Sequence, residues 1–339
     1  MKIAIGLSGG VDSAAAAYLL KEQGHEVLGI TLILQEGDGQ QGDIEDAKKA
    51  AALLGIDFVT VDAREIFKKE VIGNFISEYQ SGRTPSPCII CNEKLKFGLM
   101  LSQAMRMGCD KIATGHYAAV EYIGGMPYLR NTFGSKDQTY FLYRLGSDTL
   151  SKVIFPLSQY TKGEIREIAQ KAGIPVFHKK DSLEICFVPG DDYVPFLLSK
   201  GVHSPEGDFV DTSGKVIGRH KGIINYTIGQ RKGLGAFGKP MFVTKIDSVK
   251  NIVTLGENGE QYKSSLSCDN AVFNSLAEGN CFEAMVKIRY KAPLVKGVVT
   301  RTDFGFTVEF TQPQRSVTPG QSCALYTDSG FLIGGGVIK

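Results

Sequence analysis

The sequence predicts an α/β protein: a doubly wound parallel sheet followed by a small mostly-β central domain and a C-terminal β-barrel. Three observations lead to this fold class. Over the first half of the chain, short apolar runs alternate with helix-forming segments. A glycine-rich turn joins the first of these runs to the first helical segment. From Asp208 onward, short alternating strands are separated by turns such as Asn258-Gly259.

The individual elements are predicted from their periodicity and their end signals. The buried parallel strands are Lys2–Leu7, Val27–Leu34, Phe58–Val61 and Lys111–Thr114. The helices are Asp12–Gln23, Asp43–Leu54, Arg64–Ser81, Asn92–Met107 and Asp191–Ser199, with residues 35–42 as a polar loop. Thr161-Lys162-Gly163-Glu164 is typical of a capping box, and it opens a helix that Gly173 ends. Ligands of such a sheet bind at the carboxyl ends of its strands.

Length and composition limit the possible classes of protein. A chain of 339 residues is long enough for two or three domains. We expect an ATP-binding catalytic domain at 1–203, a central linker domain at 204–268 and a barrel at 269–339. No apolar run approaches the roughly 20 residues that cross a bilayer. The first strand starts at once, which leaves no room for a signal peptide and favours a cytoplasmic protein.

Charge and cysteine content add less. The net charge of +2 does not by itself indicate nucleic-acid binding. Seven cysteines in a cytoplasmic protein are thiols or ligands more often than structural disulfides. Four of them lie in strand-like apolar patterns and are interpreted as core or surface thiols: Cys109, Cys268, Cys281 and Cys323.

The turn Gly6-Leu7-Ser8-Gly9-Gly10-Val11-Asp12-Ser13 is the most informative stretch. A glycine-rich turn between a strand and a helix points several backbone N–H groups at one place. The helix dipole adds positive potential there, so the turn can hold an anion such as a phosphate. It is not a Walker A loop, because the Gly-Lys-Ser/Thr ending is absent.

Three other cysteines stand apart from the four above. Cys88 and Cys91 form a Cys-Xaa-Xaa-Cys motif after two prolines, which predict an extended approach. With a helix predicted near Asn92, Cys91 would lie at a helix N-terminus, where the dipole stabilises a thiolate. The third is Cys186, nearly a hundred residues further along.

The chain resembles the tRNA-specific 2-thiouridylases, a family of pyrophosphatase-loop (PP-loop) enzymes. The resemblance begins with Ser-Gly-Gly-Val-Asp-Ser, the signature of a loop that cuts ATP between its α- and β-phosphates, and includes both cysteine motifs. It continues in family order through Ala113–Tyr117, Lys136–Leu142, Phe155–Leu157, Tyr226–Gly235, Arg289-Tyr290 and Thr318–Gln321. Each string is short, but together they span nearly the whole chain.

The resemblance implies an adenine nucleotide alpha hydrolase-like fold and an ATP-dependent tRNA sulfurtransferase. Such an enzyme adenylates O2 of the wobble uridine (U34) and replaces it with sulfur, releasing AMP and pyrophosphate. ATP, with Mg²⁺, would be bound by Gly6, Leu7, Ser8, Gly9, Gly10, Val11, Asp12, Ser13, Leu32 and Gly115. The implied partners are the tRNA anticodon stem-loop and a sulfur-donor protein, a cysteine desulfurase or relay, acting on a monomer.

The resemblance also implies roles for the cysteines and for tRNA contacts. A persulfide on Cys186 would attack C2 of the activated uridine. Cys91 would assist by attacking the persulfide or releasing sulfide from it, leaving a Cys91–Cys186 disulfide bond to be reduced. The tRNA contacts implied are Ser86, Pro87, Cys88, His116, Lys136, Asp137, Gln138, Arg289, Tyr290 and Gln321.

Cys88 departs from the family pattern, because the best-known members have Asp there. Three thiols at positions 88, 91 and 186 could instead hold a [4Fe–4S] cluster with one open iron. The cluster and the persulfide are therefore alternative hypotheses. A structural zinc site would need a fourth ligand, and Cys88 could also be a plain thiol.

Other functions remain compatible with parts of the sequence. A PP-loop ATP pyrophosphatase could be a ligase or amidotransferase on a small carbonyl substrate, which would need no sulfur-carrying cysteine. Sulfur could also pass to an acceptor other than tRNA, or the chain could be an inactive RNA-binding relative. The intact loop argues against the last of these, and the C-terminal motifs favour RNA.

Overall fold

The computed structural model describes residues 1–35, 38–132, 136–174, 185–188, 190 and 192–339. The chain forms two compact units, each discontinuous in sequence. The first comprises Met1–Val71, Cys88–Leu183 and Ser329–Leu332. The second comprises Ile72–Pro87, Glu184–Asp328 and Ile333–Lys339.

A five-stranded parallel sheet forms the centre of the first unit, in the order β3-β2-β1-β4-β7. Its strands are β1 (Lys2–Gly6), β2 (Glu26–Ile33), β3 (Asp57–Asp62), β4 (Lys111–Ala113) and β7 (Val153–Ile154). The order changes direction at β1, so the carboxyl ends of β1 and β4 border the crevice where doubly wound sheets bind ligands.

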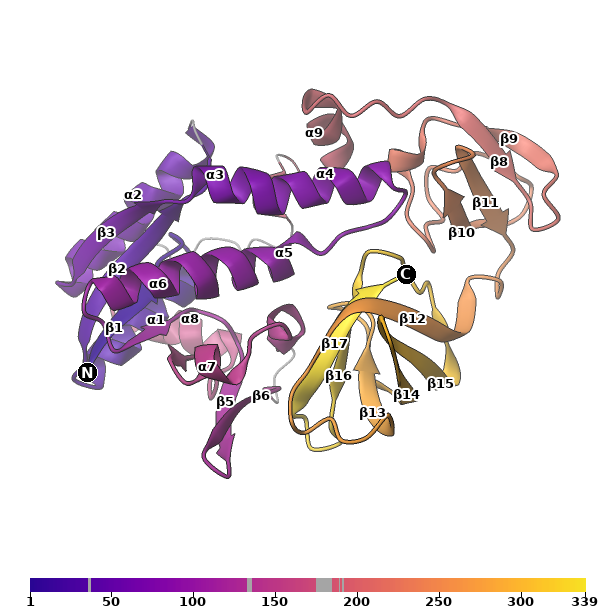
Figure 1. Ribbon diagram of the computed structural model, residues 1–339. Coiled ribbons are helices and arrows are strands. Elements are labelled where there is room, and N and C mark those ends of the chain that lie inside the picture. Colours follow the sequence, from indigo (N-terminus) through magenta and orange to yellow (C-terminus); the bar gives the residue numbers. More distant parts are fainter. Residues whose placement is uncertain (36–37, 133–135, 175–184, 189, 191) are drawn as a thin grey trace. The chain divides into compact units, whose positions relative to one another are not determined.

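Helices cover both faces of this sheet (Figure 1). On one face, Ile3 and Ile5 pack into a core with α1 (Val11–Glu22), α2 (Asp38–Leu54) and α8 (Lys162–Lys171). Toward the opposite face, a Cβ on Gly6 would lie 3.2 Å from the Met100 sulfur, in η2 (Cys91–Met100). The sheet is therefore buried on both sides, which accounts for its continuous apolar strands.

The remaining elements of residues 64–150 are short. They are α3 (Arg64–Ile66), η1 (Phe67–Ile72), α4 (Gly73–Gln80), α5 (Pro87–Ile90), α6 (Leu101–Arg106), β5 (Ala119–Ile123), β6 (Met126–Arg130), η3 (Thr139–Leu142) and α7 (Ser147–Leu150). Strands β5 and β6 form an antiparallel hairpin, which the sequence analysis did not predict.

The second unit contains a four-stranded sheet and a closed barrel. The sheet has the order β10-β11-β8-β9, formed by β8 (Gly207–Val210), β9 (Val216–His220), β10 (Phe242–Asp247) and β11 (Ile252–Gly256). The barrel has the order β12-β15-β14-β13-β16-β17. Its strands are β12 (Tyr262–Phe273), β13 (Cys281–Lys287), β14 (Val295–Thr302), β15 (Gly305–Arg315), β16 (Ser322–Tyr326) and β17 (Leu332–Ile338). Helix α9 (Tyr193–Ser199) and η6 (Ile223–Asn225) complete the described elements.

The core of the barrel explains why the sequence of the C-terminal segment predicts strands with alternating hydrophobicity. Val286, Val299, Phe306 and Leu325 are fully or almost fully buried inside it. In β13, β14 and most of β15, alternate residues therefore face the interior and many of the intervening positions are partly or fully exposed, whereas β16 is buried along its whole length. Closure also leaves no unpaired barrel edge. The predicted boundary at 268/269 falls within β12.

The predicted fold class is confirmed, and so are the four parallel strands. The capping box is confirmed as well: the Thr161 hydroxyl accepts from Glu164 N, and Glu164 Oε2 accepts from Thr161 N. Two helix starts were predicted wrongly. Helix α2 begins at Asp38 rather than Asp43, and the helix predicted from Asn92 begins at Pro87. Among the described residues, no helix is long and apolar enough to cross a membrane.

Candidate active site

The glycine-rich loop joins β1 to α1 as the sequence predicts. Gly9 has a φ of +71°, and a Cβ there would lie 2.4 Å from the carbonyl oxygen of Asp43. Both the backbone conformation and the close approach of α2 therefore require glycine. Gly10 is the N-cap of α1, and no side chain of the described residues caps it. The first-turn N–H groups of α1 thus have no side-chain acceptor and can bind an anion.

The two serines of the loop are not equivalent. Ser13 is buried, accepts a hydrogen bond from Ser8 N at 3.1 Å and donates to Gly10 O at 3.0 Å. Its hydroxyl therefore stabilises the loop from inside. Ser8 is exposed, with its Oγ 3.2 Å from Ser13 Oγ. Of the two, Ser8 is the one whose hydroxyl can reach a ligand.

Asp12 lies in the first turn of α1 and is contacted from two other segments. Its Oδ1 accepts hydrogen bonds from Tyr117 Oη at 2.9 Å and from Lys162 Nζ at 2.6 Å. The Lys162 side chain is only 13% exposed. A short charge-assisted hydrogen bond at a partly buried position holds both groups in one geometry.

Neither Lys162 nor Tyr117 was predicted as a site residue from the sequence. Lys162 is the first residue of α8, and its segment was interpreted only as a helix start. Tyr117 lies in a motif of the resemblance, which pointed to this tyrosine without giving it a role. The signal for Lys162 is tertiary, because it is 150 residues from Asp12 in sequence.

The structure brings Gly115 against the loop. A Cβ on Gly115 would lie 2.9 Å from the Asp12 carbonyl carbon and 2.9 Å from Ser13 N. Any larger side chain would push on the backbone of the first turn. Leu32 lies near the carboxyl end of β2 and is half-buried, with its carbonyl accepting from Gln40 Nε2 at 2.7 Å.

Cys91 does not lie at a helix N-terminus, contrary to the prediction. The helix begins at Pro87, so Cys91 is the fifth residue of a continuous helical segment that becomes π-helical at that point. The prediction treated Pro87 as part of an extended approach, but proline is favoured in the first turn of a helix. Burial raises the pKa of the Cys91 thiol, with Lys96 acting weakly in the opposite direction.

Cys88 is in the first helical turn and is exposed. It precedes Cys91 by three residues, so both thiols lie on one side of the helix. Cys186 is also exposed but belongs to the second unit. Cys88 and Cys91 are therefore brought together by local structure, whereas Cys186 belongs to another part of the fold.

The partial burial of Cys91 predicts slow alkylation. At pH 7.5, we expect iodoacetamide to modify Cys91 at least about tenfold more slowly than the exposed Cys281, because only the thiolate reacts. Mass spectrometry of peptides from timed reactions measures both rates in one sample. Equal rates for the two cysteines would contradict the raised pKa of the half-buried Cys91.

His116, an implied tRNA contact, is buried among apolar groups. Its Nδ1 lies 2.8 Å from Thr114 Oγ1, and the rings of Phe97 and Phe155 lie about 6 Å away. Burial lowers the pKa of His116 well below 6.5, and Lys96 lowers it further. The imidazole is therefore neutral near pH 7.

This burial predicts an acid-sensitive contribution to stability. The folded pKa of His116 lies below the unfolded value, so the unfolded chain binds the proton first. Above pH 6.5, neutral His116 does not lower the free energy of unfolding. As the pH falls below 6.5, the free energy of unfolding decreases by up to about 1.4 kcal/mol per pH unit. We expect His116→Gln to reduce the loss between pH 7 and pH 5, measured by urea unfolding with circular dichroism. The exposed His203→Gln is the matched control, and equal pH dependence in both variants would contradict the prediction.

The implied tRNA contacts at 136–138 take part in internal bonds. Asp137 accepts from Thr132 N at 3.1 Å and from the Thr139 hydroxyl at 2.7 Å. The side-chain oxygen Oε1 of Gln138 accepts a hydrogen bond from Tyr117 N at 3.0 Å. The backbone N–H of Gln138 donates to Tyr117 O at 2.8 Å. Gln138 therefore holds the tyrosine that contacts Asp12. Lys136 is half-buried.

Three further implied tRNA contacts, Arg289, Tyr290 and Gln321, lie between strands of the barrel. Arg289 Nη2 donates to Ile228 O at 3.1 Å and to Ser316 O at 3.0 Å. Gln321 Nε2 donates to Thr84 O at 2.9 Å and to Pro85 O at 3.1 Å. Four implied tRNA contacts remain. Pro87 is buried, Cys88 is exposed, and Ser86 and Tyr290 are half-buried.

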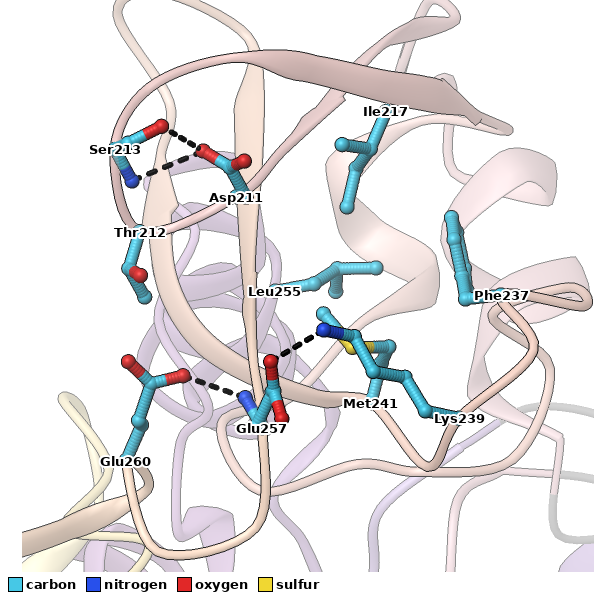
Figure 2. Close-up of a pocket in the computed structure, with 10 residues that line it drawn as sticks. All are labelled: Asp211, Thr212, Ser213, Ile217, Phe237, Lys239, Met241, Leu255, Glu257 and Glu260. Carbon is cyan, nitrogen blue, oxygen red and sulfur yellow. Dashed lines mark hydrogen bonds and ion pairs between the residues drawn. The ribbon is translucent and has the colours of Figure 1, made fainter.

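A cavity of about 520 Å³ lies elsewhere in the second unit and contains none of the implied site residues. Figure 2 shows its apolar side, formed by residues such as Met241 and Leu255, and its acidic groups. The carboxylates are already engaged: Asp211 accepts from Ser213, and Glu257 pairs with Lys239. These interactions are solvent-exposed and join segments next to the strands of the same sheet, so they support the local fold rather than a reaction.

Three family models match the chain in succession. They are the tRNA methyl transferase HUP domain over residues 1–190, the tRNA methyl transferase PRC-barrel domain over 196–257 and the Aminomethyltransferase beta-barrel domain over 263–338. The tRNA-specific 2-thiouridylase MnmA of Clostridium acetobutylicum is 45% identical, over 100% of this chain and 99% of its own. The chain belongs to the tRNA-specific 2-thiouridylase family. The relatives from Treponema denticola (45% identical) and Clostridioides difficile (42%) also match 100% of this chain and 98% of their own.

Membership of the 2-thiouridylase family agrees with the resemblance drawn from the motifs. The names of the matching models refer to methyl transfer, whereas these full-length relatives are named thiouridylases. Among solved structures, the U34-tRNA thiolase NcsA from Methanococcus maripaludis with its [4Fe-4S] cluster is 20% identical, with a TM-score of 0.37 over 56% of this chain and 60% of its own. That likeness is too low to support an argument about this 2-thiouridylase family member.

Proposed function

We propose that the chain is an ATP-dependent tRNA sulfurtransferase that converts the wobble uridine U34 to 2-thiouridine. The observation that carries this proposal is 45% identity to a tRNA-specific 2-thiouridylase over the whole of both chains. Uridine O2 is a poor leaving group. Adenylation of O2 by ATP releases pyrophosphate, and sulfur then displaces AMP from C2.

ATP is proposed to bind where β1 meets α1, with phosphates at the uncapped first turn of α1. The residues proposed for ATP are Gly6, Leu7, Ser8, Gly9, Gly10, Val11, Asp12, Ser13, Leu32 and Gly115. Asp12 is the acidic group in this turn and would hold Mg²⁺ beside the departing pyrophosphate. Lys162 orients the Asp12 carboxylate and adds positive charge next to the phosphates.

For sulfur transfer, one proposed route uses a persulfide on Cys186. Its terminal sulfur attacks C2 and AMP leaves, so a disulfide links Cys186 to the uridine sulfur. The Cys91 thiolate then attacks the Cys186 sulfur, and 2-thiouridine leaves with the electron pair. This forms a Cys91–Cys186 disulfide, which an external dithiol reduces with two electrons before the next turnover.

The other proposed route uses a [4Fe–4S] cluster held by Cys88, Cys91 and Cys186. The one-turn spacing of Cys88 and Cys91 suits two ligands of one cluster. The burial that raises the pKa of Cys91 suits an enclosed ligand, since metal coordination deprotonates a thiol. When bound, such a cluster would supply an open iron for the sulfide. The chain would supply three thiolates and exclude water around Cys91.

The remaining proposals concern organisation and partners. The chain would act as a cytoplasmic monomer on the tRNA anticodon stem-loop, with sulfur from a cysteine desulfurase or relay protein. Its domains would be a catalytic one at 1–203, a linker at 204–268 and a tRNA-contacting barrel at 269–339. An unpaired anticodon base suits such an enzyme, because it can be flipped into a pocket and stacked there.

A single-turnover assay tests both the function and the route. Protein purified without oxygen is mixed with ATP, sulfide or a persulfide donor, and tRNA carrying U34 or C34. We expect 2-thiouridine and AMP to form only with ATP and U34. Absence of 2-thiouridine with both sulfur sources would contradict the function. Full activity in iron-free protein would exclude the cluster route, whereas about four irons per chain, required for activity, would exclude the persulfide route.

A further inference from the structure

Gln321 lies between β15 and β16, and its side-chain amide spans two carbonyl groups of a distant segment. Nε2 donates to Thr84 O at 2.9 Å and to Pro85 O at 3.1 Å. An amide nitrogen carries two hydrogens, so these bonds use its whole donor capacity. Only the oxygen of this side chain can still bind another group. Pro85 is buried, so its carbonyl would lose a partner at some cost without this bond.

The backbone on either side of Gln321 reinforces the contact. Thr84 N donates to Pro319 O at 2.8 Å. Gly320 has a φ of +88°, and a Cβ there would lie 2.9 Å from Thr84 N and 3.0 Å from Thr84 O. The loop therefore packs on the 84–85 backbone without space for a side chain.

The loop that makes these contacts is itself fixed. Arg289 Nη2 donates to Ser316 O and to the Thr318 hydroxyl, and that hydroxyl donates to Ser316 O at 2.8 Å. Ser316 and Thr318 are buried. Residues 84–85, Arg289 and the 316–321 loop all belong to the second unit.

We propose that Gln321 is a positioning residue for sulfur transfer: it holds the 84–85 segment, which leads directly into the helix that carries Cys88 and Cys91. Helix α5 begins only two residues after Pro85. The chain passes from the second unit to the first between Pro87 and Cys88. While residues 84–85 are held by Gln321, few backbone conformations are open to the start of this helix. Without these hydrogen bonds, more conformations would be accessible.

This role differs from a direct tRNA contact in what it predicts. A contact residue affects tRNA binding, so its loss raises KM. A positioning residue acts before tRNA binds and mainly lowers kcat, because the thiols are less often in the reactive arrangement. The effect on kcat rests on the proposed function, but the effect on the free protein does not.

The first test compares Gln321→Met with Gln314→Met, using the full chain without tRNA. Both changes remove a barrel glutamine amide, but within the described part of the chain Gln314 Nε2 donates only to Gln312 O, and Gln312 is exposed. Hydrogen exchange with mass spectrometry reports the backbone amides of Arg83, Thr84, Ser86 and Cys88, since Pro85 and Pro87 have none. We expect exchange in this segment to be about tenfold faster in Gln321→Met and unchanged in Gln314→Met. Unchanged exchange in Gln321→Met would overturn the proposal.

A second pair of variants leaves the glutamine in place. Gly320→Ala introduces a methyl group against Thr84, whereas Gly214→Ala has a nearly equal φ of +89° and meets nothing within 4 Å. We expect faster exchange over 83–88 in Gly320→Ala only. This pair keeps the proposal testable if Gln321→Met does not fold.

Steady-state kinetics with tRNA then separate positioning from contact. We expect Gln321→Met to lower kcat about tenfold with a tRNA KM within twofold of wild type. A raised KM at unchanged kcat would assign Gln321 to tRNA contact instead. If the wild-type chain does not thiolate tRNA, the proposed function fails, while the exchange results still decide whether Gln321 anchors the segment.

Discussion

Asp12→Ala is expected to lower the rate of uridine adenylation by about a thousandfold. The carboxylate accepts hydrogen bonds from Tyr117 and Lys162 and lies in the turn where we propose that the phosphates bind. Its loss removes the proposed Mg²⁺ ligand and leaves the largely buried Lys162 without this carboxylate. Loss of one preorganised electrostatic group costs about 10²–10³ in rate, and here a metal contact goes with it.

Pyrophosphate release in a single turnover with saturating tRNA measures this effect. Asp110→Ala is the matched control, because Asp110 is exposed. Among the described residues, its carboxylate accepts a hydrogen bond only from Lys2 N. Normal pyrophosphate release by Asp12→Ala would refute the assignment of the loop to ATP. Circular dichroism confirms that both variants fold.

A double-mutant cycle shows whether Lys162 acts through Asp12. We expect Lys162→Met alone to lower adenylation about a hundredfold. If the two groups act as a pair, the double variant is little slower than Asp12→Ala. Strictly additive losses would show that Lys162 acts independently of Asp12.

Cys186→Ser is expected to abolish 2-thiouridine formation while leaving U34-dependent cleavage of ATP to AMP within about threefold. A serine hydroxyl can neither carry sulfane sulfur nor act as a thiolate ligand. Adenylation transfers AMP from ATP to O2 of the uridine and has no step that uses a thiol, so we expect it to proceed without Cys186.

Mass spectrometry of digested tRNA and chromatography of AMP measure both products in one reaction. Cys281→Ser is the control, since Cys281 is equally exposed but lies on a barrel strand. Full thiolation by Cys186→Ser would remove this cysteine from the mechanism. Loss of both products would mean that Cys186 also supports adenylation.

Several patterns that depend on near neighbours were predicted correctly from the sequence. The strand, the glycine turn and the helix from Lys2 to Glu22 follow from local conformational preferences, and so does the capping box at Thr161. The start of the Cys91 helix was not predicted, because Pro87 is compatible with both an extended approach and a first helical turn. That choice depends on packing, and Ile89 and Leu95 are buried.

In the candidate site, too, some features can be predicted from the sequence and others cannot. The glycine-rich loop is visible in the sequence because its backbone geometry requires particular residues at adjacent positions. The roles of Lys162 and Gln321 are not visible, since each depends on a partner more than a hundred residues away. A contact of that kind leaves no periodicity or spacing to detect.

For this protein, the sequence by itself predicts the parallel sheet, the barrel region and the family motifs. Short-range conformational preferences and hydrophobic alternation depend on residues that are neighbours in the chain. Only the folded structure decides that Cys91 is half-buried inside a helix, that Ser13 faces inward, and that Asp12 contacts Lys162. Those features arise from desolvation and from contacts between distant segments, and both exist only after the chain has packed.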